Sequence, residues 1–287
     1  MNKIIYLGKK SLNLYVPENL IPKNFKKLGY EVYRPVCVET TFEKLKNDIL
    51  DNQDADFLFV YGRGLFPVLT SIIKEVKIPK IIWMPSIITD SPGAQSIVKN
   101  DLPYFDIVYT CIPSEKGLYK KLGVDSRTLF AATDGDYYKS LDINRDINIG
   151  FYGNVNYDNR KKLIEYINQK YDLCAIFSGD KYIELINRTK INVNMGLFSF
   201  GIPNRVFDTL SCGQFLISPE YIGIDSIFKN KKHLVYFDKN NLYDILDYYL
   251  ENADERDKIA NEGQKEVLEK HTFIHRIKEI IKDVAIL

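Results

Sequence analysis

The stretch I-N-I-G-F-Y at 147–152 decides the fold, because it restarts a pattern of alternating strands and helices in the middle of the chain. It is a predicted strand rich in β-branched and aromatic residues, and it leads into a Gly-Asn turn and a predicted helix over 158–170. The same alternation continues downstream, with strands predicted at 172–177, 190–194, 214–218 and 234–237 and helices at 179–188, 204–212 and 240–251. Alternation of this kind is typical of βαβ units around a parallel sheet.

The residues before this restart form an independent run of the same pattern. Strands are predicted at 3–7, 31–34, 56–60, 80–83 and 106–109, and helices at 18–28, 41–51 and 66–76. Gly29 follows Leu28 at the place of a helix C-cap glycine. The sequence therefore predicts two α/β domains in line, a doubly wound domain over 1–140 and a second domain of similar build over 146–271.

Two segments lie outside the alternation. Residues 130–146 are polar and without periodicity, so we interpret them as an interdomain linker. Residues 253–284 are predicted to be helical with no further strand. Within this helix Ile277, Ile280, Ile281 and Val284 are spaced i, i+3, i+4 and i+7, which predicts an apolar stripe that must be buried.

Charge and composition exclude several functions. The 287 residues include 39 Lys+Arg and 38 Asp+Glu, a balance that argues against a nucleic-acid partner, which needs a basic excess. No stretch approaches the roughly 18 apolar residues of a transmembrane helix. The cysteines are widely spaced and match no metal-binding or redox motif, so we expect thiols in a cytoplasmic, reducing location: Cys37, Cys111, Cys174 and Cys212.

The most informative segment for function is M-G-L-F-S-F-G-I-P-N-R-V-F-D-T-L-S-C-G-Q-F-L-I-S-P-E at 195–220. Pro203 suits the first turn of a helix, whose free N–H groups and positive dipole end would bind a diphosphate. Arg205 in that turn can add a bidentate phosphate contact. Asp208, one turn later, is better suited to a ribose hydroxyl. The alternative is a capped surface helix in which Arg205 and Asp208 form a local ion pair.

Other candidate residues follow predicted strands. Gly153 and Asn154 with Arg160 form either a phosphate-facing loop or a plain turn with a solvated arginine. Asp90, in the T-D-S-P turn with Ser91, is a candidate catalytic or acceptor-binding acid, although aspartate in such turns also makes purely local hydrogen bonds. Arg63 in Y-G-R-G could face the cleft or belong to a simple turn. His271 and His275 are spaced i, i+4, but they lie in a lysine-rich helical context, so we expect no metal site there; no P-loop or G-x-G-x-x-G is present.

Residues 147–276 resemble the GT-B glycosyltransferases, in particular the CgeB-like (spore maturation protein) branch of the glycosyl transferases group 1 superfamily. The family pattern N/R-x-F-(E/D)-x-L-(A/S)-C-G-x-F-L-(I/L) is matched by Asn204 to Ile217. Further similar segments are I-N-I-G-F-Y-G-N at 147–154, Y-I-E-L-I-N-R-T-K-I-N-V-N at 182–194, D-S-I-F-K-N-K-K-H-L-V-Y-F at 225–237 and the run 255–276. In the first domain only W-M-P-S-I-I-T-D-S-P at 83–92 is loosely similar.

The resemblance implies two facing Rossmann-like domains, with the C-terminal helix at 272–287 crossing back to complete the first. It implies a glycosyltransferase of hexosyltransferase type that uses a UDP-, GDP- or TDP-type sugar and needs no metal or other cofactor. The acceptor, a glycan, protein or small molecule, would be presented by the first domain. Donor-binding residues carried over by position or by the phosphate argument are Gly153, Asn154, Arg160, Gly201, Asn204, Arg205, Asp208 and Gly213.

One position departs from the family. Retaining members carry two acids eight positions apart, and the first of these falls on Phe200 in this chain. We therefore expect an acid of the first domain to substitute, with Asp90 as the candidate beside a catalytic Arg205. A GT-B-fold epimerase or hydrolase, and a non-catalytic nucleotide-sugar-binding subunit, remain alternatives.

Overall fold

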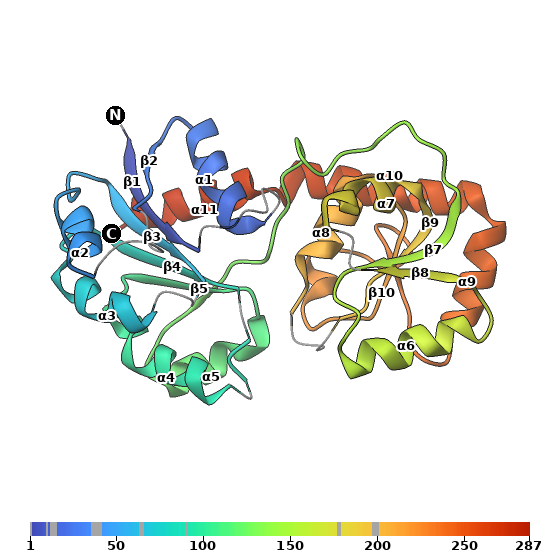
Figure 1. Ribbon diagram of the computed structural model, residues 1–287, viewed down its shortest axis with the longest axis horizontal. Helices are drawn as coiled ribbons and strands as arrows, with labels where there is room; N and C mark the ends of the chain where they lie inside the picture. Colours follow the sequence, from blue (N-terminus) through green and yellow to red (C-terminus); the bar gives the residue numbers. More distant parts are fainter. Residues whose placement is uncertain are drawn as a thin grey trace. The chain divides into compact units, whose positions relative to one another are not determined.

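The chain folds into two α/β units in the computed structural model, which describes residues 2–9, 11, 16–35, 42–62, 66–85, 87–89, 91–176, 179–196 and 201–287. The first unit comprises Met1–Phe130 together with Phe273–Leu287, and the second comprises Ala131–Thr272 (Figure 1). The division falls at Phe130 and Ala131, ahead of the expected boundary at 140–146.

The first unit is built on a six-stranded parallel sheet of order β2-β1-β3-β4-β5-β6. Its strands are β1 (Lys3–Gly8), β2 (Glu31–Tyr33), β3 (Phe57–Tyr61), β4 (Lys80–Met84), β5 (Ile107–Thr110) and β6 (Arg127–Thr128). Every described residue of β3 is buried, because both faces of a parallel sheet are covered by helices. The order reverses at β1, which lies between β2 and β3, as in a doubly wound sheet.

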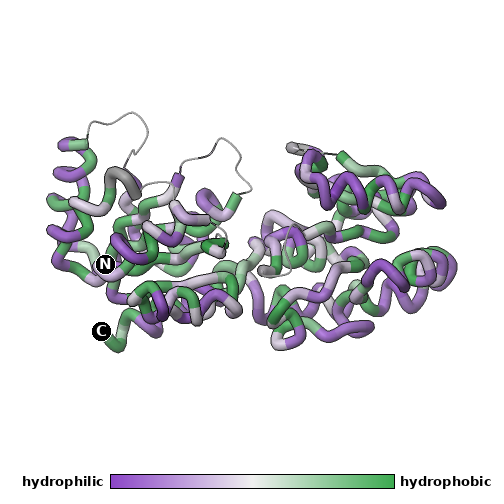
Figure 2. The backbone as a smooth tube through the Cα atoms, turned by 90° about the horizontal axis from the view of Figure 1, so that it is seen from below, coloured by the Kyte–Doolittle hydropathy of each residue, from purple (hydrophilic) through white to green (hydrophobic). Residues whose placement is uncertain are grey.

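The helices of the first unit connect these strands. They are α1 (Pro17–Lys27), α2 (Phe42–Leu50), α3 (Phe66–Glu75), α4 (Pro92–Asn100), α5 (Lys116–Lys121) and the final α11 (Phe273–Val284). Gly29 has a φ of +84° and its amide bonds to the Lys26 carbonyl, so it terminates α1 as the sequence predicts. Helix α4 has no counterpart among the predicted helices. Along the helices hydrophilic and hydrophobic residues alternate in colour, as expected for one buried face (Figure 2).

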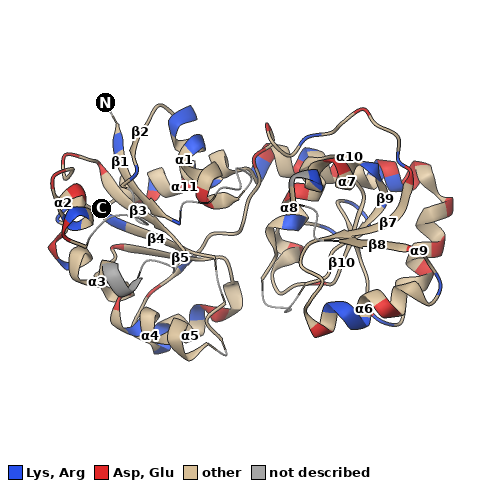
Figure 3. Cartoon of the chain, in the orientation of Figure 1, with Lys and Arg blue, Asp and Glu red and all other residues tan. Residues whose placement is uncertain are grey.

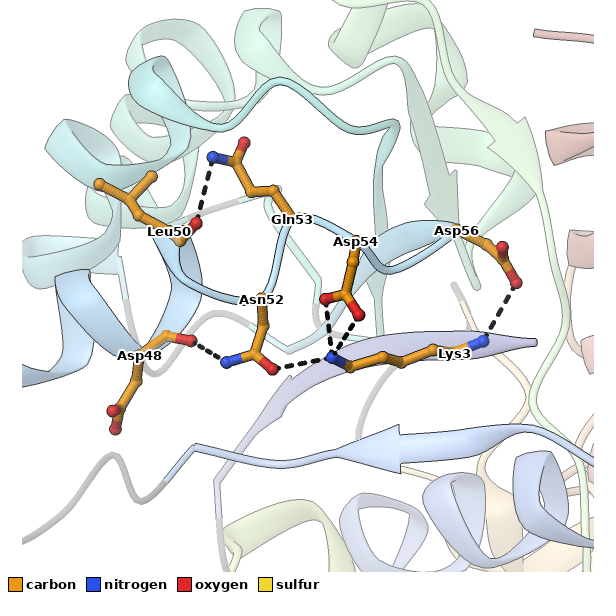
Figure 4. A network of polar contacts seen from close by, with 7 residues as sticks. All are labelled: Lys3, Asp48, Leu50, Asn52, Gln53, Asp54 and Asp56. Atoms are coloured by element: carbon orange, nitrogen blue, oxygen red, sulfur yellow. Dashed lines mark hydrogen bonds and ion pairs between the residues drawn. The ribbon is translucent and has the colours of Figure 1, made fainter. Parts of the chain in front are cut away.

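A polar network fixes the amino end of β1 (Figure 4). Lys3 Nζ donates to Asn52 Oδ1 at 2.9 Å and to Asp54 Oδ1 at 2.7 Å, and the Lys3 amide donates to Asp56 Oδ2 at 3.2 Å. These contacts join β1 to the segment between α2 and β3. They lie at the amino edge of the sheet. Ligands of such folds bind at the opposite edge, at the carboxyl ends of the strands.

Helix α11 completes the first unit, and it packs against α1. Ile277 and Ile280 are fully buried, while Ile281 and Val284 are half-buried. Asp283, near the end of the helix, accepts a hydrogen bond from the Tyr109 hydroxyl at 2.6 Å and pairs with Arg127 at 2.7 Å. The apolar stripe is thus covered by the first unit, although this helix is the last in sequence.

The second unit is built on a five-stranded parallel sheet of order β11-β10-β9-β7-β8. Its strands are β7 (Ile147–Tyr152), β8 (Leu173–Ile176), β9 (Thr189–Val193), β10 (Leu216–Ser218) and β11 (Val235–Tyr236). Its helices are α6 (Asp158–Asn168), α7 (Tyr182–Arg188), α8 (Asn204–Ser211), α9 (Leu242–Glu251) and α10 (Ala253–Lys270). Charged residues gather on the helices and loops of each unit, and the strands are largely uncharged (Figure 3).

Residues 131–145 belong to the second unit and are bonded to it, which corrects the prediction of a linker over 130–146. The Thr133 amide bonds to the His271 carbonyl, Ser140 Oγ donates to the Cys212 carbonyl at 2.8 Å, and Arg145 pairs with Asp257 at 2.6 Å. The polar side chains that make this segment look like a linker instead bond to the second unit. The predicted helix over 253–284 is also divided, since α10 ends before His271 and α11 begins at Phe273.

Candidate functional site

The candidate site lies at the carboxyl edge of the second sheet. Strands β7 and β9 are neighbours, so the residues that follow them, Gly153-Asn154 and Asn194-Met195, meet at this edge. Helix α8 begins nearby at Asn204, with Arg205 in its first turn. The structure therefore brings together side chains that are more than fifty positions apart in sequence.

Arg205 is fixed against the end of β7. Its Nε donates to the Tyr152 carbonyl at 3.0 Å and its Nη1 donates to Asn194 Oδ1 at 3.2 Å. The guanidinium lies 4.6 Å from the centre of the Phe151 ring. A Cβ on Gly153 would stand 2.3 Å from Arg205 Nη2, so glycine is required there for the arginine to occupy this place.

Arg160, in α6, is fixed beside the same ring. Its Nε donates to the Met195 carbonyl at 2.9 Å and its Nη1 donates to the Asn154 carbonyl at 2.6 Å. The guanidinium lies 5.3 Å from the centre of the Phe151 ring and 5.2 Å from that of Tyr157. The residue is only 8% exposed. Arg160 is therefore not the solvated arginine of a plain turn, and the phosphate-facing loop stays a prediction.

The two arginines form a cationic pair, and Asp208 acts on Arg205 through its charge without forming an ion pair. In the part of the chain that the structure describes, neither makes an ion pair with a carboxylate, and their hydrogen-bond acceptors are all neutral. Burial, and next the charge of Arg205, lower the pKa of Arg160 to about 10. An anion bound here would compensate both charges, which is the electrostatic signature of a phosphate site.

Asn194 orients Arg205, a role that sequence reasoning missed. Its side chain is fully buried, and Nδ2 donates to Ser218 Oγ at 3.0 Å and to the Tyr221 hydroxyl at 2.9 Å. These two bonds direct Oδ1 toward the guanidinium. A buried strand ending in asparagine, N-V-N at 192–194, was the available signal.

Helix α8 begins at Asn204, where the prediction over 204–212 places it, and Pro203 lies just before its first turn. Pro203 is the N-cap, with φ −72° and ψ 152°, and Asn204 is the first helical residue. No side chain caps this end, and the first N–H groups of a helix have no partner within it. Gly201 and Asn204 therefore stand at the helix end that favours an anion.

Asp208 occupies a buried position and does not pair with Arg205. No ion pair joins the two side chains, which are both described, so the ion-pair alternative is wrong. Asp208 is 6% exposed, and its Oδ1 accepts a hydrogen bond from Thr133 Oγ1 at 2.9 Å. Burial raises its pKa well above the usual value.

Gly213 has a structural role in place of the expected donor contact. It follows the carboxyl end of α8, at the opposite end from Arg205, and its φ is +66°. Its amide bonds to the Leu210 carbonyl at 2.9 Å. The glycine is explained by the left-handed helix end, which is a common use of this residue.

The candidates of the first unit are only partly described. Asp90 and Arg63 lie outside the described residues, as does Phe200 of the second unit. Ser91 precedes α4 as its N-cap residue. Sequence reasoning missed Glu115, a buried residue whose Oε1 accepts hydrogen bonds from the amides of Ile88 and Thr89, at 2.9 and 2.7 Å, and from Thr89 Oγ1.

Among the side chains within the described ranges, no group of three or more His, Cys, Asp and Glu could hold a metal ion. In the same ranges, none of the helices combines the length and hydrophobicity that crossing a bilayer requires.

The arrangement of strands is that of known GT-B glycosyltransferases. HepE from Anabaena, solved with UDP-glucose, is 10% identical over 99% of this chain and 100% of that chain, with a TM-score of 0.74. An alpha-glucosyltransferase solved with UDP-glucose and DNA containing an abasic site is 10% identical over 99% of both chains, with a TM-score of 0.72. Sucrose-phosphate synthase from Thermosynechococcus elongatus is also 10% identical over 99% of both chains, with a TM-score of 0.69. At these identities the likeness establishes the GT-B fold.

Sequence comparison defines the family. The glycosyl transferase-like family matches residues 138–282, just over half of the chain, including α8 and both arginines. The chain therefore belongs to the glycosyl transferase-like family. No curated protein matches the sequence.

Proposed function

We propose that this protein transfers a sugar, of hexosyl type, from a nucleotide-diphosphate sugar to an acceptor. The observation that carries the proposal is the pair of arginines, Arg160 and Arg205, placed on one aromatic ring at the carboxyl edge of the second sheet without acidic partners. Ligands of open α/β sheets bind at this edge. The donor would be of UDP, GDP or TDP type, as the binding of UDP-glucose by HepE and the alpha-glucosyltransferase supports.

The arginine pair defines what the site can do to the donor. When the bond between sugar and diphosphate breaks, negative charge accumulates on the departing diphosphate. Two fixed guanidinium groups and the amino end of α8 stabilise that charge without reorganising. In this proposal the arginines supply the positive charge that a divalent cation supplies in other transferases, so transfer is independent of metal.

The remaining donor contacts are assigned from their positions. The Gly153-Asn154 loop, Gly201 and Asn204 would border the diphosphate, and Asp208 would serve the ribose. Since Thr133 already bonds to Asp208 Oδ1, a ribose hydroxyl would have to use the second oxygen of this carboxylate. We also propose membership of the CgeB-like branch, on the match of residues 204–217, and a cytoplasmic location, in keeping with the free thiols of Cys111, Cys174 and Cys212.

A panel of nucleotides and nucleotide sugars tests the proposal. We expect UDP, GDP or TDP to raise the melting temperature, and a ligand at a hundred times its Kd stabilises the folded protein by about 2.7 kcal/mol. Isothermal titration would then give the Kd with and without EDTA. Failure of every diphosphate to bind, with Arg160 and Arg205 intact, would exclude the donor site.

Turnover distinguishes the transferase from its rivals. A transferase consumes the nucleotide sugar faster when an acceptor is present, an epimerase or hydrolase does so without one, and a binding subunit does not consume it. Release of the nucleoside diphosphate, measured over a panel of glycan, protein and small-molecule acceptors, separates these classes.

A further inference from the structure

We propose that the carboxyl edge of the first sheet holds a second anion site, centred on Arg34, which binds a phosphate or carboxylate group of the acceptor. The assignment of this anion to the acceptor rests on the proposed function. The site itself rests on the geometry of the first unit alone.

Arg34 stands at the end of two neighbouring strands. Strands β1 and β2 are parallel and adjacent, β2 ends at Tyr33, and Arg34 follows directly. Its Nη1 donates to Asn19 Oδ1 at 3.0 Å and its Nη2 donates to the Lys9 carbonyl at 3.3 Å. The guanidinium lies 5.3 Å from the centre of the Tyr6 ring. A planar cation is therefore fixed at the sheet edge where ligands of this fold bind.

The charge of Arg34 is not compensated within the described residues. The two hydrogen-bond acceptors described for Arg34 are neutral, and none of the described carboxylates forms an ion pair with it. The exposed Lys9 adds a second positive charge beside it. Glu18, in the first turn of α1, acts on Tyr6 through its charge but forms no ion pair with Arg34. An anion at this place would meet a net positive environment.

A buried hydroxyl provides an independent indication of a ligand. Tyr6 is fully buried, and its hydroxyl has no hydrogen-bond partner among the described residues. The hydroxyl extends toward the carboxyl end of β1, because a Cβ on Gly8 would stand only 2.8 Å from it. Burial raises the pKa of Tyr6, so the hydroxyl keeps its proton and can donate. Unpaired buried donors are rare, and an acceptor oxygen of a ligand would satisfy this one.

The second unit uses the same construction in its arginine pair. There Arg205 lies on the ring of Phe151 at the end of β7, the first strand of its unit, beside Gly153. In the first unit Arg34 lies on the ring of Tyr6 in β1, with Gly8 at the strand end. In both units neutral oxygens hold the guanidinium, which leaves its charge available to a ligand. Arginine in this setting favours planar or tetrahedral oxyanions through paired hydrogen bonds.

Titrations of the full chain with inorganic phosphate and with acetate, followed by amide chemical shifts, test the site. We expect one set of shifts around Gly8 and Lys9 and a separate set around Gly153 and Asn154. Arg34→Gln should weaken the first set at least tenfold and leave the second unchanged, and Arg205→Gln should do the reverse. A response to phosphate only would indicate a phosphorylated acceptor, and a response to acetate only a carboxylate.

Two further variants separate binding from folding. Arg127→Gln removes another arginine of the first unit, which pairs with Asp283, and should leave the Gly8 shifts intact. Tyr6→Phe keeps the ring below Arg34 and removes the hydroxyl, so phosphate should bind several-fold more weakly without loss of melting temperature. Unchanged binding in Tyr6→Phe would contradict the role of the hydroxyl.

The two proposals fail in different ways. Absence of shifts at Gly8 and Lys9, or shifts that persist in a folded Arg34→Gln protein, would overturn the second anion site and leave the donor site untouched. Absence of shifts at Gly153 and Asn154 alone would instead count against the donor site.

Discussion

At the scale of single residues, the contact between Gly153 and Arg205 gives a sharp test of the donor site. A methyl group at position 153 would stand 2.3 Å from Arg205 Nη2, so Gly153→Ala should displace the guanidinium. We expect affinity for the preferred nucleoside diphosphate to fall roughly tenfold or more by isothermal titration. Gly213→Ala is the matched control: the positive φ and the 2.8 Å approach of a Cβ to Ser140 Oγ should cost at least about 1 kcal/mol of stability, and the Kd should stay unchanged. Equal affinities of Gly153→Ala and the unmodified protein would contradict the assigned site.

Arg205 and Asp208 should differ in the ligand that they affect. Arg205→Ala removes a charge-assisted contact with phosphate, so binding of the nucleoside diphosphate should weaken by roughly 1.5–3 kcal/mol while binding of the nucleoside stays constant. Asp208→Asn should weaken both ligands alike, because the ribose is common to them. Calorimetry on each variant measures this, with Arg188→Ala as the control, because Arg188 is a half-buried arginine of the same unit that pairs with Asp146. Equal losses for both ligands in Arg205→Ala would refute its role.

The burial of Asp208 predicts a pH effect on stability. Its pKa is raised above the ordinary 3.8, so the folded protein binds this proton more tightly than the unfolded chain does. The stabilisation is therefore complete below the ordinary pKa and is lost as the pH rises toward the raised pKa. The free energy of unfolding of the unmodified protein, relative to Asp208→Asn, should be larger at about pH 4 than at about pH 7, because it falls as the pH rises above the ordinary pKa. Urea unfolding measures this difference. If the difference in unfolding free energy between the two proteins is the same at both pH values, Asp208 does not titrate in this way.

At the scale of elements, α11 should contribute strongly to the first unit. Ile280 is fully buried and Ile281, its neighbour, is only half-buried. Ile280→Ala should therefore destabilise this unit by about 2–5 kcal/mol, and Ile281→Ala by clearly less. Chemical denaturation followed by Trp83 fluorescence reports on this unit, because Trp83 contacts Phe273 of α11. The same loss in both variants would contradict the observed burial.

Elements with strong periodicity were predictable from sequence, and those shaped by tertiary hydrogen bonds were not. Strands such as 147–152 and 80–83 were found within about one residue, because their continuous apolar runs fit a sheet covered on both faces. Helix α4 was missed because P-G-A-Q-S-I-V-K-N reads as a turn followed by a weak pattern. Segment 131–145 was misread because its side chains and backbone amides bond to residues more than forty positions away, as the Leu141 amide does by donating to Asn187 Oδ1.

The sequence located the two arginines of the candidate site but not the residues that hydrogen-bond to the site residues and orient them. Arg160 follows a predicted strand and loop, and Arg205 lies in the first turn of a predicted helix, so the sequence alone identifies both. Asn194, Thr133 and Glu115 act through side-chain bonds that only the fold assembles. Gly213 was assigned to the donor because a glycine in a family motif does not reveal whether it serves a ligand or a helix end.

At the scale of the whole molecule, the proposed transfer should not depend on a divalent cation. The Kd of the preferred nucleoside diphosphate should be the same in EDTA and in magnesium, because the arginine pair already supplies the opposing charge. Titration calorimetry in both buffers checks this, and sugar transfer measured in EDTA provides the second reading. Loss of binding in the chelator, restored by magnesium, would show that a cation is required.

The division of the chain also determines the order in which its parts can be completed during synthesis. The second unit is one continuous segment, Ala131–Thr272, whereas the first needs α11, which follows it. Domains generally fold as units while the ribosome elongates the chain. The early residues of the first unit therefore cannot complete their fold until the second unit has been synthesised. Until then the surface that covers Ile277 and Ile280 stays exposed. The N-terminal half of this protein is translated first and finished last.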